Sequence, residues 1–424
     1  MALQSFVGIS STTQQYTTIS GVDSNLLSID IYYLNDYQTV TNRPVVIYIH
    51  GGAWNLGDKS AVESKATFFN NLGYVFVSVN YRLSDKTLAN RTYLFPNQYP
   101  ISGWPADRVK HSNPTKNHIG DCATAVTWIY NNISSYGGNK DKLVLIGHSA
   151  GAQLVTLLST NQSYLTAAGL PSGKIVGCIS LDTEANSGIE QQITDPIADG
   201  EFPEELLQLY YENAFGIYPD TSVTKTTSPI TTDFATIADA QASYATASPI
   251  NYVSSLSIPP FLLFHRGEQK RVDRENLFST ALQNAGKTFT LVTYPGGDTP
   301  DPVSGIYTGA YTHGEIKDCI GATYDPAIDP ATGVQKPLPS GVSNVTTQIK
   351  NWITNLVPAP SVITSRNSIS FGQIAAEFGT PTGKNLGAYR VSQTISGLTN
   401  MPLDAGRSEE HTSELQSRQY LVCR

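Results

Sequence analysis

The sequence predicts an α/β fold with a mostly parallel sheet that helices cover on both faces. Short apolar runs rich in β-branched residues alternate along the chain with segments of helical periodicity. Two of these runs end in glycine-rich turns. Such alternation is typical of βαβ units, in which the connecting helices lie on both faces of a parallel sheet. Ligands of these sheets bind beyond the carboxyl ends of the strands, so we expect the functional residues there.

The apolar runs and the periodic segments give the expected order of elements. We expect strands at residues 26–33, 45–50, 74–81, 143–148, 175–182, 261–266 and 289–294. We expect helices near residues 60–72, 119–135, 149–160, 204–214, 274–286 and 344–356. Two long insertions, at about 83–118 and about 183–256, interrupt the alternation. Long connections in a compact fold are commonly lids or binding loops, so we expect both to shape a pocket.

The composition fits one large α/β domain with an appendage. The 424 residues are 40% hydrophobic and 15% charged, which is enough to bury a sizeable core. A net charge of −8 argues against nucleic acid or an anionic membrane as a partner. Neither a signal peptide nor a transmembrane run is evident, so we expect a cytoplasmic or virion-associated location. The four cysteines form no C-x-x-C pair, which argues against a metal site.

A G-x-S-x-G sequence at residues 147–151 follows one apolar run and precedes a helical pattern. Ser149 is therefore expected on a sharp turn between a strand and a helix, where small neighbours avoid clashes and the hydroxyl is exposed as a nucleophile. A second glycine-rich turn, His-Gly-Gly-Ala at residues 50–53, follows the run at 45–49. The backbone N–H groups of Gly52 and Ala53, together with that of Ala150, are suited to hold a developing oxyanion. The pair of motifs predicts acyl transfer.

With these two motifs, the chain resembles an α/β-hydrolase of the HGG-motif esterase group. That group includes hormone-sensitive-lipase-like, feruloyl-esterase-like and kynurenine-formamidase-like proteins. The resemblance runs from the first strand to about Leu356 and implies a serine hydrolase that acts on carboxylic esters without a cofactor. Further matching segments are Asn-Tyr-Arg-Leu at 80–83, residues 121–128, Ala-Ser-Pro-Ile at 247–250 and residues 260–264.

In this fold the general base follows the last strand and precedes the final helix, and His313 lies in that stretch of the sequence. His313 is therefore the expected base. His50 belongs to the glycine turn and His148 to the G-x-S-x-G sequence. His265 ends a strand run and is expected to be structural or to lie behind the site.

The orienting carboxylate departs from the family pattern. An aspartate is expected four residues after His265, but Gln269 stands there. Glu268, next to it, is one candidate acid. The other is Asp182, at the end of the strand that follows the nucleophile helix. Related sequences with a His-Arg-Gly turn, as at 265–267, pair it with a Leu-Asp-Thr of this kind, which favours Asp182. Acidic residues 273 and 275 are expected in the first turn of a helix.

Beyond Leu356 the resemblance ends. Residues 357–406 are expected to form a linker and a small module similar to the ends of virion structural proteins of marine phages. Residues 407–424 resemble the translation of a sequencing-library adapter, which implies that the natural C-terminus is missing. Three functions follow as hypotheses. The first is hydrolysis of a short acyl or aryl ester or of an acylated polysaccharide. The others are a formamidase or amidase of the same fold, and a non-catalytic virion protein.

Overall fold

The computed structural model describes residues 8–84, 114–197, 204–216, 234–296, 309–322 and 338–360. The chain divides into a large unit, Ile9–Ala359, and a second unit made of Met1–Gly8 and Pro360–Arg424. Of the second unit only Gly8 and Pro360 are described. The predicted phage-like module and the adapter-like segment therefore lie outside the described residues, as does most of the first insertion.

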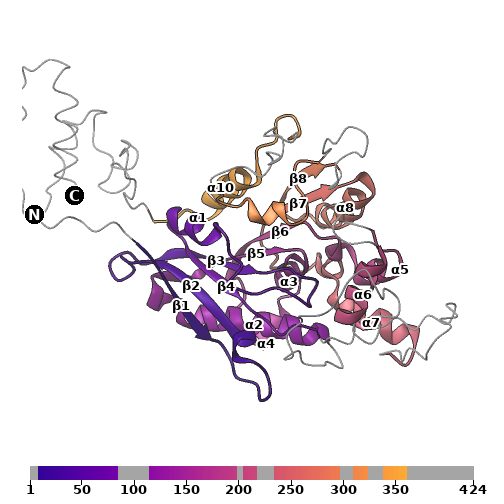
Figure 1. Ribbon diagram of the computed structural model, residues 1–424, viewed down its shortest axis with the longest axis horizontal. Coiled ribbons are helices and arrows are strands. Elements are labelled where there is room, and N and C mark those ends of the chain that lie inside the picture. The colour runs from indigo at the N-terminus through magenta and orange to yellow at the C-terminus, as the bar shows by residue number, and fades with distance from the viewer. Residues whose placement is uncertain are drawn as a thin grey trace, which may run out of the picture. The chain divides into compact units, whose positions relative to one another are not determined.

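An eight-stranded sheet in the order β1-β2-β4-β3-β5-β6-β7-β8 forms the centre of the large unit (Figure 1). β2 pairs antiparallel with both β1 and β4, and all pairings from β4 to β8 are parallel. The predicted α/β fold with a mostly parallel sheet is confirmed. The strands are β1 Ile9–Gln15, β2 Ser28–Leu34, β3 Arg43–Ile49, β4 Val75–Val79, β5 Gly138–His148, β6 Ile175–Leu181, β7 Phe261–Gly267 and β8 Phe289–Pro295.

Helices cover both faces of this sheet, because successive side chains of a strand point to opposite faces and both sets are apolar here. Ten α-helices lie within the described residues. They are α1 Lys65–Asn71, α2 Pro114–Asn132, α3 Ala150–Thr160, α4 Ser163–Ala167, α5 Ile189–Thr194, α6 Glu204–Phe215, α7 Ile237–Ala247, α8 Gln269–Asn284, α9 Glu315–Asp318 and α10 Val345–Leu356. Short 3-10 helices are η1 Ser24–Leu27, η3 Ile133–Tyr136, η4 Glu184–Ser187 and η5 Pro249–Tyr252.

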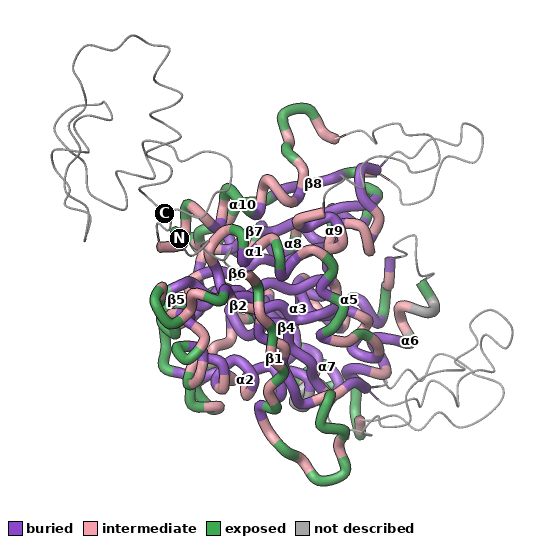
Figure 2. The backbone as a smooth tube through the Cα atoms, turned by 60° about the vertical axis from the view of Figure 1, so that its left-hand side comes forward, coloured by how far each residue is buried: buried purple, intermediate pink, exposed green. Residues whose placement is uncertain are grey.

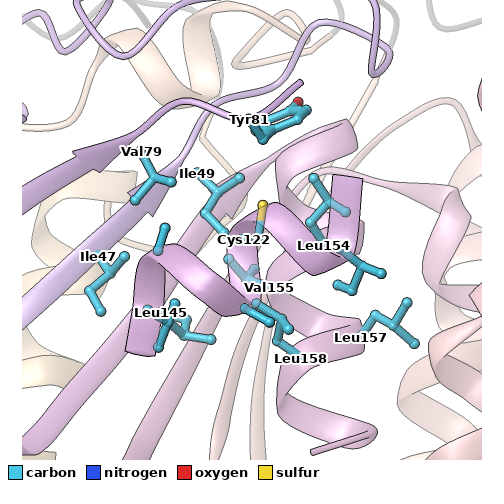
Figure 3. Packing of buried hydrophobic residues seen from close by; sticks show 14 of the residues in the cluster. Ile47, Ile49, Val79, Tyr81, Cys122, Leu145, Leu154, Val155, Leu157 and Leu158 are labelled. Atoms are coloured by element: carbon cyan, nitrogen blue, oxygen red, sulfur yellow. The ribbon is translucent and has the colours of Figure 1, made fainter. Parts of the chain in front are cut away.

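The core consists of two apolar layers, one on each face. Val46 and Tyr48 of β3 pack with residues of α1, α9 and α10, whereas Ile47 and Ile49 pack with α2 and α3. Figure 3 shows the second layer, in which Cys122 of α2 lies among side chains of the strands and α3. Cys122 and Cys178 are buried and free. Figure 2 shows buried residues along the strands and along helices that pack on them, such as α3.

Among the elements that differ from the expectation are β1 and α8. Strand β1 was not predicted, because Ile9–Gln15 is mostly polar and alternates between exposed and half-buried residues at the edge of the sheet. Helix α8 begins at Gln269 instead of near residue 274. Glu275 is consequently not a first-turn residue that compensates the helix dipole, and it is buried. No helix among the described residues is long and apolar enough to cross a bilayer.

Candidate active site

Ser149 lies between β5 and α3 in a backbone conformation that L-residues rarely adopt, with φ 55 and ψ −121. The glycines on either side explain the motif. A Cβ on Gly147 would overlap the backbone of Gly151, and a Cβ on Gly151 would overlap the carbonyl of Ile49. The N–H of Ser149 donates to the carbonyl of Leu181 at 3.0 Å, which ties this elbow (residues 147–151) to β6.

The second glycine-rich segment, which we call the HGG turn (residues 50–57), follows β3. Gly52, Ala53 and Trp54 all have positive φ, at 108, 50 and 58. The N–H groups of Asn55 and Leu56 donate to the carbonyl of Gly52 at 2.9 and 2.8 Å and close the turn. Among the described residues, the N–H groups of Gly52 and Ala53 donate to no backbone carbonyl. The HGG turn itself therefore does not use these two N–H groups.

The HGG turn and the elbow are in direct contact. A Cβ added to Gly51 would lie 2.8 Å from the carbonyl oxygen of His148 and 3.0 Å from the Cβ of Ser149. The N–H of Ala150 is the first of helix α3, so no helical carbonyl precedes it as an acceptor. The three N–H groups expected to hold an oxyanion thus belong to two segments that meet beside Ser149.

His50 has a structural place at the start of the HGG turn. Its ring stacks on that of Tyr81, with centroids 4.6 Å apart, and its Nδ1–H donates to the carbonyl of Gly51 at 2.8 Å. The hydroxyl of Tyr81 donates to the backbone carbonyl of His50 at 3.1 Å. Burial lowers the pKa of His50, so its ring is neutral at neutral pH. These contacts fix where the HGG turn leaves β3.

His313 and Asp182 are brought together from distant parts of the sequence. The Nδ1 of His313 lies 2.5 Å from Oδ2 of Asp182, and both side chains are buried. Asp182 follows β6 with φ 53, and its N–H donates to the carbonyl of Phe264 at 2.9 Å. The other candidate acid, Glu268, lies exposed at the N-cap of α8. The structure therefore brings Asp182, and not Glu268, to His313.

The segment that carries His313 is anchored to the elbow through His148. The Nε2–H of His148 donates to the backbone carbonyl of His313 at 2.7 Å, and the two rings lie 4.5 Å apart. Burial and the neighbouring His313 lower the pKa of His148 well below its usual range, so its ring is uncharged. Because His148 precedes Ser149 in the chain, this contact places the His313 segment beside the serine.

Two arginines hold the carboxylate of Asp182, and sequence reasoning missed both. The Nε of Arg266 lies 2.5 Å from Oδ2, and the Nη2 of Arg271 lies 2.9 Å from Oδ1. Burial alone would raise the pKa of Asp182, but the two guanidinium groups and His313 hold it well below its usual range. The His-Arg-Gly sequence that contains Arg266 could have predicted this contact, because an arginine at the end of an apolar strand needs a buried anion as its partner.

The ligand atoms of His148, Asp182 and His313 lie within 4.8 Å of one another, as those of a metal site do. Their contacts do not fit a metal ion. The Nδ1 of His313 is bonded to Asp182, and both oxygens of Asp182 accept hydrogen bonds from arginines. A cation at this point would face two guanidinium groups and find no open carboxylate. The arrangement suits proton transfer by His313.

The second insertion reaches the HGG turn. The rings of Tyr211 and Phe215 on α6 lie 5.1 and 4.7 Å from that of Trp54. The amide of Asn213, also on α6, donates to the side chain of Asn55. The first insertion is described only at its ends, where Ser84 and His118 contact each other. His265 lies buried behind the site and contacts Asn276, with Nδ1 and Oδ1 3.0 Å apart.

Residues 29–98 and 105–284, more than half of the chain, match the family described as BD-FAE. The chain belongs to the BD-FAE family. The resemblance to α/β-hydrolase esterases is thereby confirmed. The match includes the HGG turn, Ser149 and Asp182, whereas His313 lies beyond its last residue.

Several curated proteins similar to this BD-FAE chain are named as esterases. Esterase LipQ of Mycobacterium tuberculosis is 26% identical over 72% of this chain and 61% of LipQ. Venom carboxylesterase-6 of Apis mellifera is 34% identical over 30% of this chain and 20% of that protein. The chain thus spans less than two thirds of the length of these relatives. A solved structure of a truncated carbohydrate esterase from gut microbiota has a TM-score of 0.48 at 15% identity, over 84% of this chain and 98% of that one.

Proposed function

We propose that this BD-FAE chain is a serine carboxylic ester hydrolase with Ser149 as nucleophile, His313 as base and Asp182 as the orienting acid. The observation that carries the proposal is the 2.5 Å contact between His313 and Asp182, in a segment anchored to the residue before Ser149. A carboxylate on Nδ1 keeps the proton of the neutral imidazole there, which leaves Nε2 as the basic nitrogen. The names of the relatives support the same reaction class.

The reaction proceeds in two steps through an acyl-enzyme. His313 takes the proton of Ser149 as the serine oxygen attacks the ester carbonyl, and the N–H groups of Gly52, Ala53 and Ala150 hold the oxyanion. The C–O bond to the alcohol breaks, and the leaving oxygen takes the proton from the imidazolium. Water then gives a proton to His313 as its oxygen attacks the acyl carbonyl. The bond to the serine oxygen breaks, the acid leaves, and His313 returns the proton to Ser149.

The substrate is proposed as a class only. A short acyl or aryl ester or an acylated polysaccharide fits the family, and α6 against the HGG turn is expected to limit the space beside the oxyanion. Relative rates on aryl esters and N-formyl aromatic amides separate an esterase from a formamidase or amidase. Association with a virion through residues 357–406 stays a prediction, because that segment lies outside the described residues beyond Pro360.

The test compares Ser149→Ala with Ser163→Ala, a matched change at an exposed serine of α4. Hydrolysis of p-nitrophenyl acetate and covalent labelling by a fluorophosphonate probe are measured for each. We expect Ser149→Ala to lose both, with kcat lower by about 10⁴-fold or more, and Ser163→Ala to retain both. Undiminished turnover in Ser149→Ala contradicts the proposal. An unlabelled, inactive wild-type protein supports the non-catalytic alternative instead.

A further inference from the structure

The carboxylate of Asp182 belongs to a buried cluster of charged side chains that extends beyond the three residues of the proposed reaction. Arg271 is at its centre. Its guanidinium contacts Asp182 from α8, pairs with Glu184 of η4, and lies 3.7 Å from Oε1 of Glu275. All four side chains are buried. Arg271 therefore joins two acidic residues of the segment after β6 to helix α8.

The charges of this cluster balance when Glu275 is neutral. Burial and the negative charge of Asp182 raise the pKa of Glu275 well above its usual range. Its Oε2 accepts a hydrogen bond from the backbone N–H of Arg266 at 3.1 Å. The carboxylates of Asp182 and Glu184 then face the guanidinium groups of Arg266 and Arg271. A proton on His313 adds one positive charge to this balanced group, and the two arginines oppose that charge.

Within the part of the chain that the structure describes, further titratable groups near the pair lie on β5, β7 and α9. His148 on β5 is uncharged because burial and His313 lower its pKa. His265 on β7 is uncharged at neutral pH because burial lowers its pKa to about 4. Lys317 on α9 carries a positive charge near His148, and its ammonium group pairs with Asp318. Removal of Arg271 thus changes the charge beside Asp182, while the contact between Asp182 and His313 does not itself involve Arg271.

Asp182 also needs to be held in its conformation. Its φ of 53 is a strained value for a residue with a side chain. Two nitrogens of the Arg271 guanidinium donate to Oδ1 of Asp182, Nη2 at 2.9 Å and Nε at 3.3 Å. The same guanidinium also pairs with Glu184, two residues after Asp182. A planar guanidinium with two adjacent acidic partners fixes the direction of the turn that carries them.

We infer that Arg271 is a positioning residue of the proposed reaction, which holds the carboxylate of Asp182 toward His313 and offsets part of its charge. The inference rests on the proposed function and assigns a part to a residue outside the usual three. Without Arg271 the carboxylate stays bonded to Arg266 and His313, but it is more mobile and more negative in effect. The imidazolium of His313 is then stabilised, so a lower fraction of the base is free at a given pH.

The main test is Arg271→Met, with Arg274→Met as the matched control. Arg274 is a second buried arginine of α8, and its guanidinium pairs with Asp195 at 2.7 Å, away from Asp182. Two readouts are used: the pH profile of kcat/KM, and an NMR titration of His313 assigned with His313→Gln. For Arg271→Met we expect the acid limb and the NMR titration to move up by about one pH unit, with kcat lower by about tenfold. Arg274→Met is expected to move neither.

Two further variants separate charge from position. Arg271→Met combined with Glu184→Gln removes one cation and one anion, so we expect the acid limb to return toward the wild-type value while kcat stays low. Arg271→Lys keeps the charge and loses the fork, so we expect a lower kcat without a shift of the limb. Circular dichroism checks folding. If Arg271→Met does not fold, these two variants carry the test, and an unchanged kcat in both overturns the inference.

The NMR titration keeps the two proposals apart because it needs no turnover. A folded Arg271→Met with an unchanged His313 titration and unchanged kcat overturns the part assigned to Arg271 and leaves the esterase proposal standing. The opposite outcome is also distinguishable. If Arg271→Met shifts the His313 titration but the wild-type protein hydrolyses no ester and binds no fluorophosphonate, the electrostatic link is supported and the proposed reaction is overturned.

Discussion

The Nε of Arg266 lies 2.5 Å from Oδ2 of Asp182, the same oxygen that contacts Nδ1 of His313. In the family pattern the end of this strand leads to the acid itself, but here it supplies a cation that holds an acid from the neighbouring strand. Because the guanidinium is permanently charged, it keeps the carboxylate ionised far below neutral pH.

Substitution of each candidate acid shows which of the two orients His313. Asp182→Asn removes the anion that stabilises the imidazolium, so we expect kcat on p-nitrophenyl acetate to fall by about 10³ to 10⁴-fold. Glu268→Gln changes an exposed N-cap residue, and we expect kcat within about twofold of wild type. Thermal melts confirm that both variants are folded. A larger loss in Glu268→Gln than in Asp182→Asn excludes the assignment.

The HGG turn depends on Gly57, whose φ is +99. A Cβ there would overlap the ring of His50 and lie 2.6 Å from the carbonyl of Gly51. We expect Gly57→Ala to lower kcat/KM by at least about tenfold and the free energy of unfolding by about 2 kcal/mol. The control is Gly173→Ala, with φ +77 and nothing within 4 Å of the added Cβ. That control carries the backbone strain without the overlap, so equal effects on kcat/KM in the two variants speak against the overlap as the cause.

Stability is expected to fall in mild acid, partly through His265. Burial lowers its pKa to about 4 in the folded protein, below the value of about 6.5 for an unfolded histidine. A lowered folded pKa gives a contribution that is present above pH 6.5 and is lost as the pH falls toward 4. We expect His265→Gln to reduce the drop in the free energy of unfolding between pH 7 and pH 4 by about 3 kcal/mol. Urea unfolding at several pH values measures this difference. The prediction is refuted if the free energy of unfolding changes with pH by the same amount in wild type and variant.

Lys65 is a buried lysine away from the site, and its ammonium group lies 5.2 Å from the centroid of Tyr48. Burial lowers the pKa of Lys65, which means that the folded protein holds the charged form less favourably than water does. Its partner Glu63 is one third exposed, so it keeps its hydration without the lysine. We therefore expect the free energy of unfolding of Lys65→Met to lie within about 1 kcal/mol of the wild-type value or to exceed it. Lys65→Ala leaves a cavity and should lose about 2 kcal/mol or more. Denaturant titrations compare the two, and an equal loss in both contradicts the reasoning.

The fold could be predicted wherever burial is continuous. All residues of β3 are buried, and the run of apolar residues at 45–49 shows it in the sequence. The polar edge strand β1 gives no such pattern, because its backbone pairing with β2 holds it in place instead. The start of α8 was missed for a related reason. Arg271 lies on its buried side only because acidic partners from another segment neutralise it, and periodicity of apolar residues cannot reveal that.

The site shows the same limit. The elbow and the HGG turn are local motifs whose glycines are fixed by steric overlap, so both could be found from a few residues. The contact of His313 with Asp182 joins residues 131 apart in the sequence, and two acids remained open until the strand ends were placed. Arg266 and Arg271 were not anticipated, since their place follows from the buried charge of Asp182.

Positive φ values gather at the carboxyl ends of the parallel strands, which form one edge of the sheet. Of the six described residues other than glycine with this conformation, four follow β3, β5 or β6: Ala53, Trp54, Ser149 and Asp182. Each such residue costs about 1–3 kcal/mol, which the rest of the fold offsets. Engineering for heat resistance should therefore leave this edge untouched and work elsewhere, for instance on the exposed faces of β1 and α7. Relaxing the strained edge would raise the melting temperature by giving up the geometry on which turnover depends.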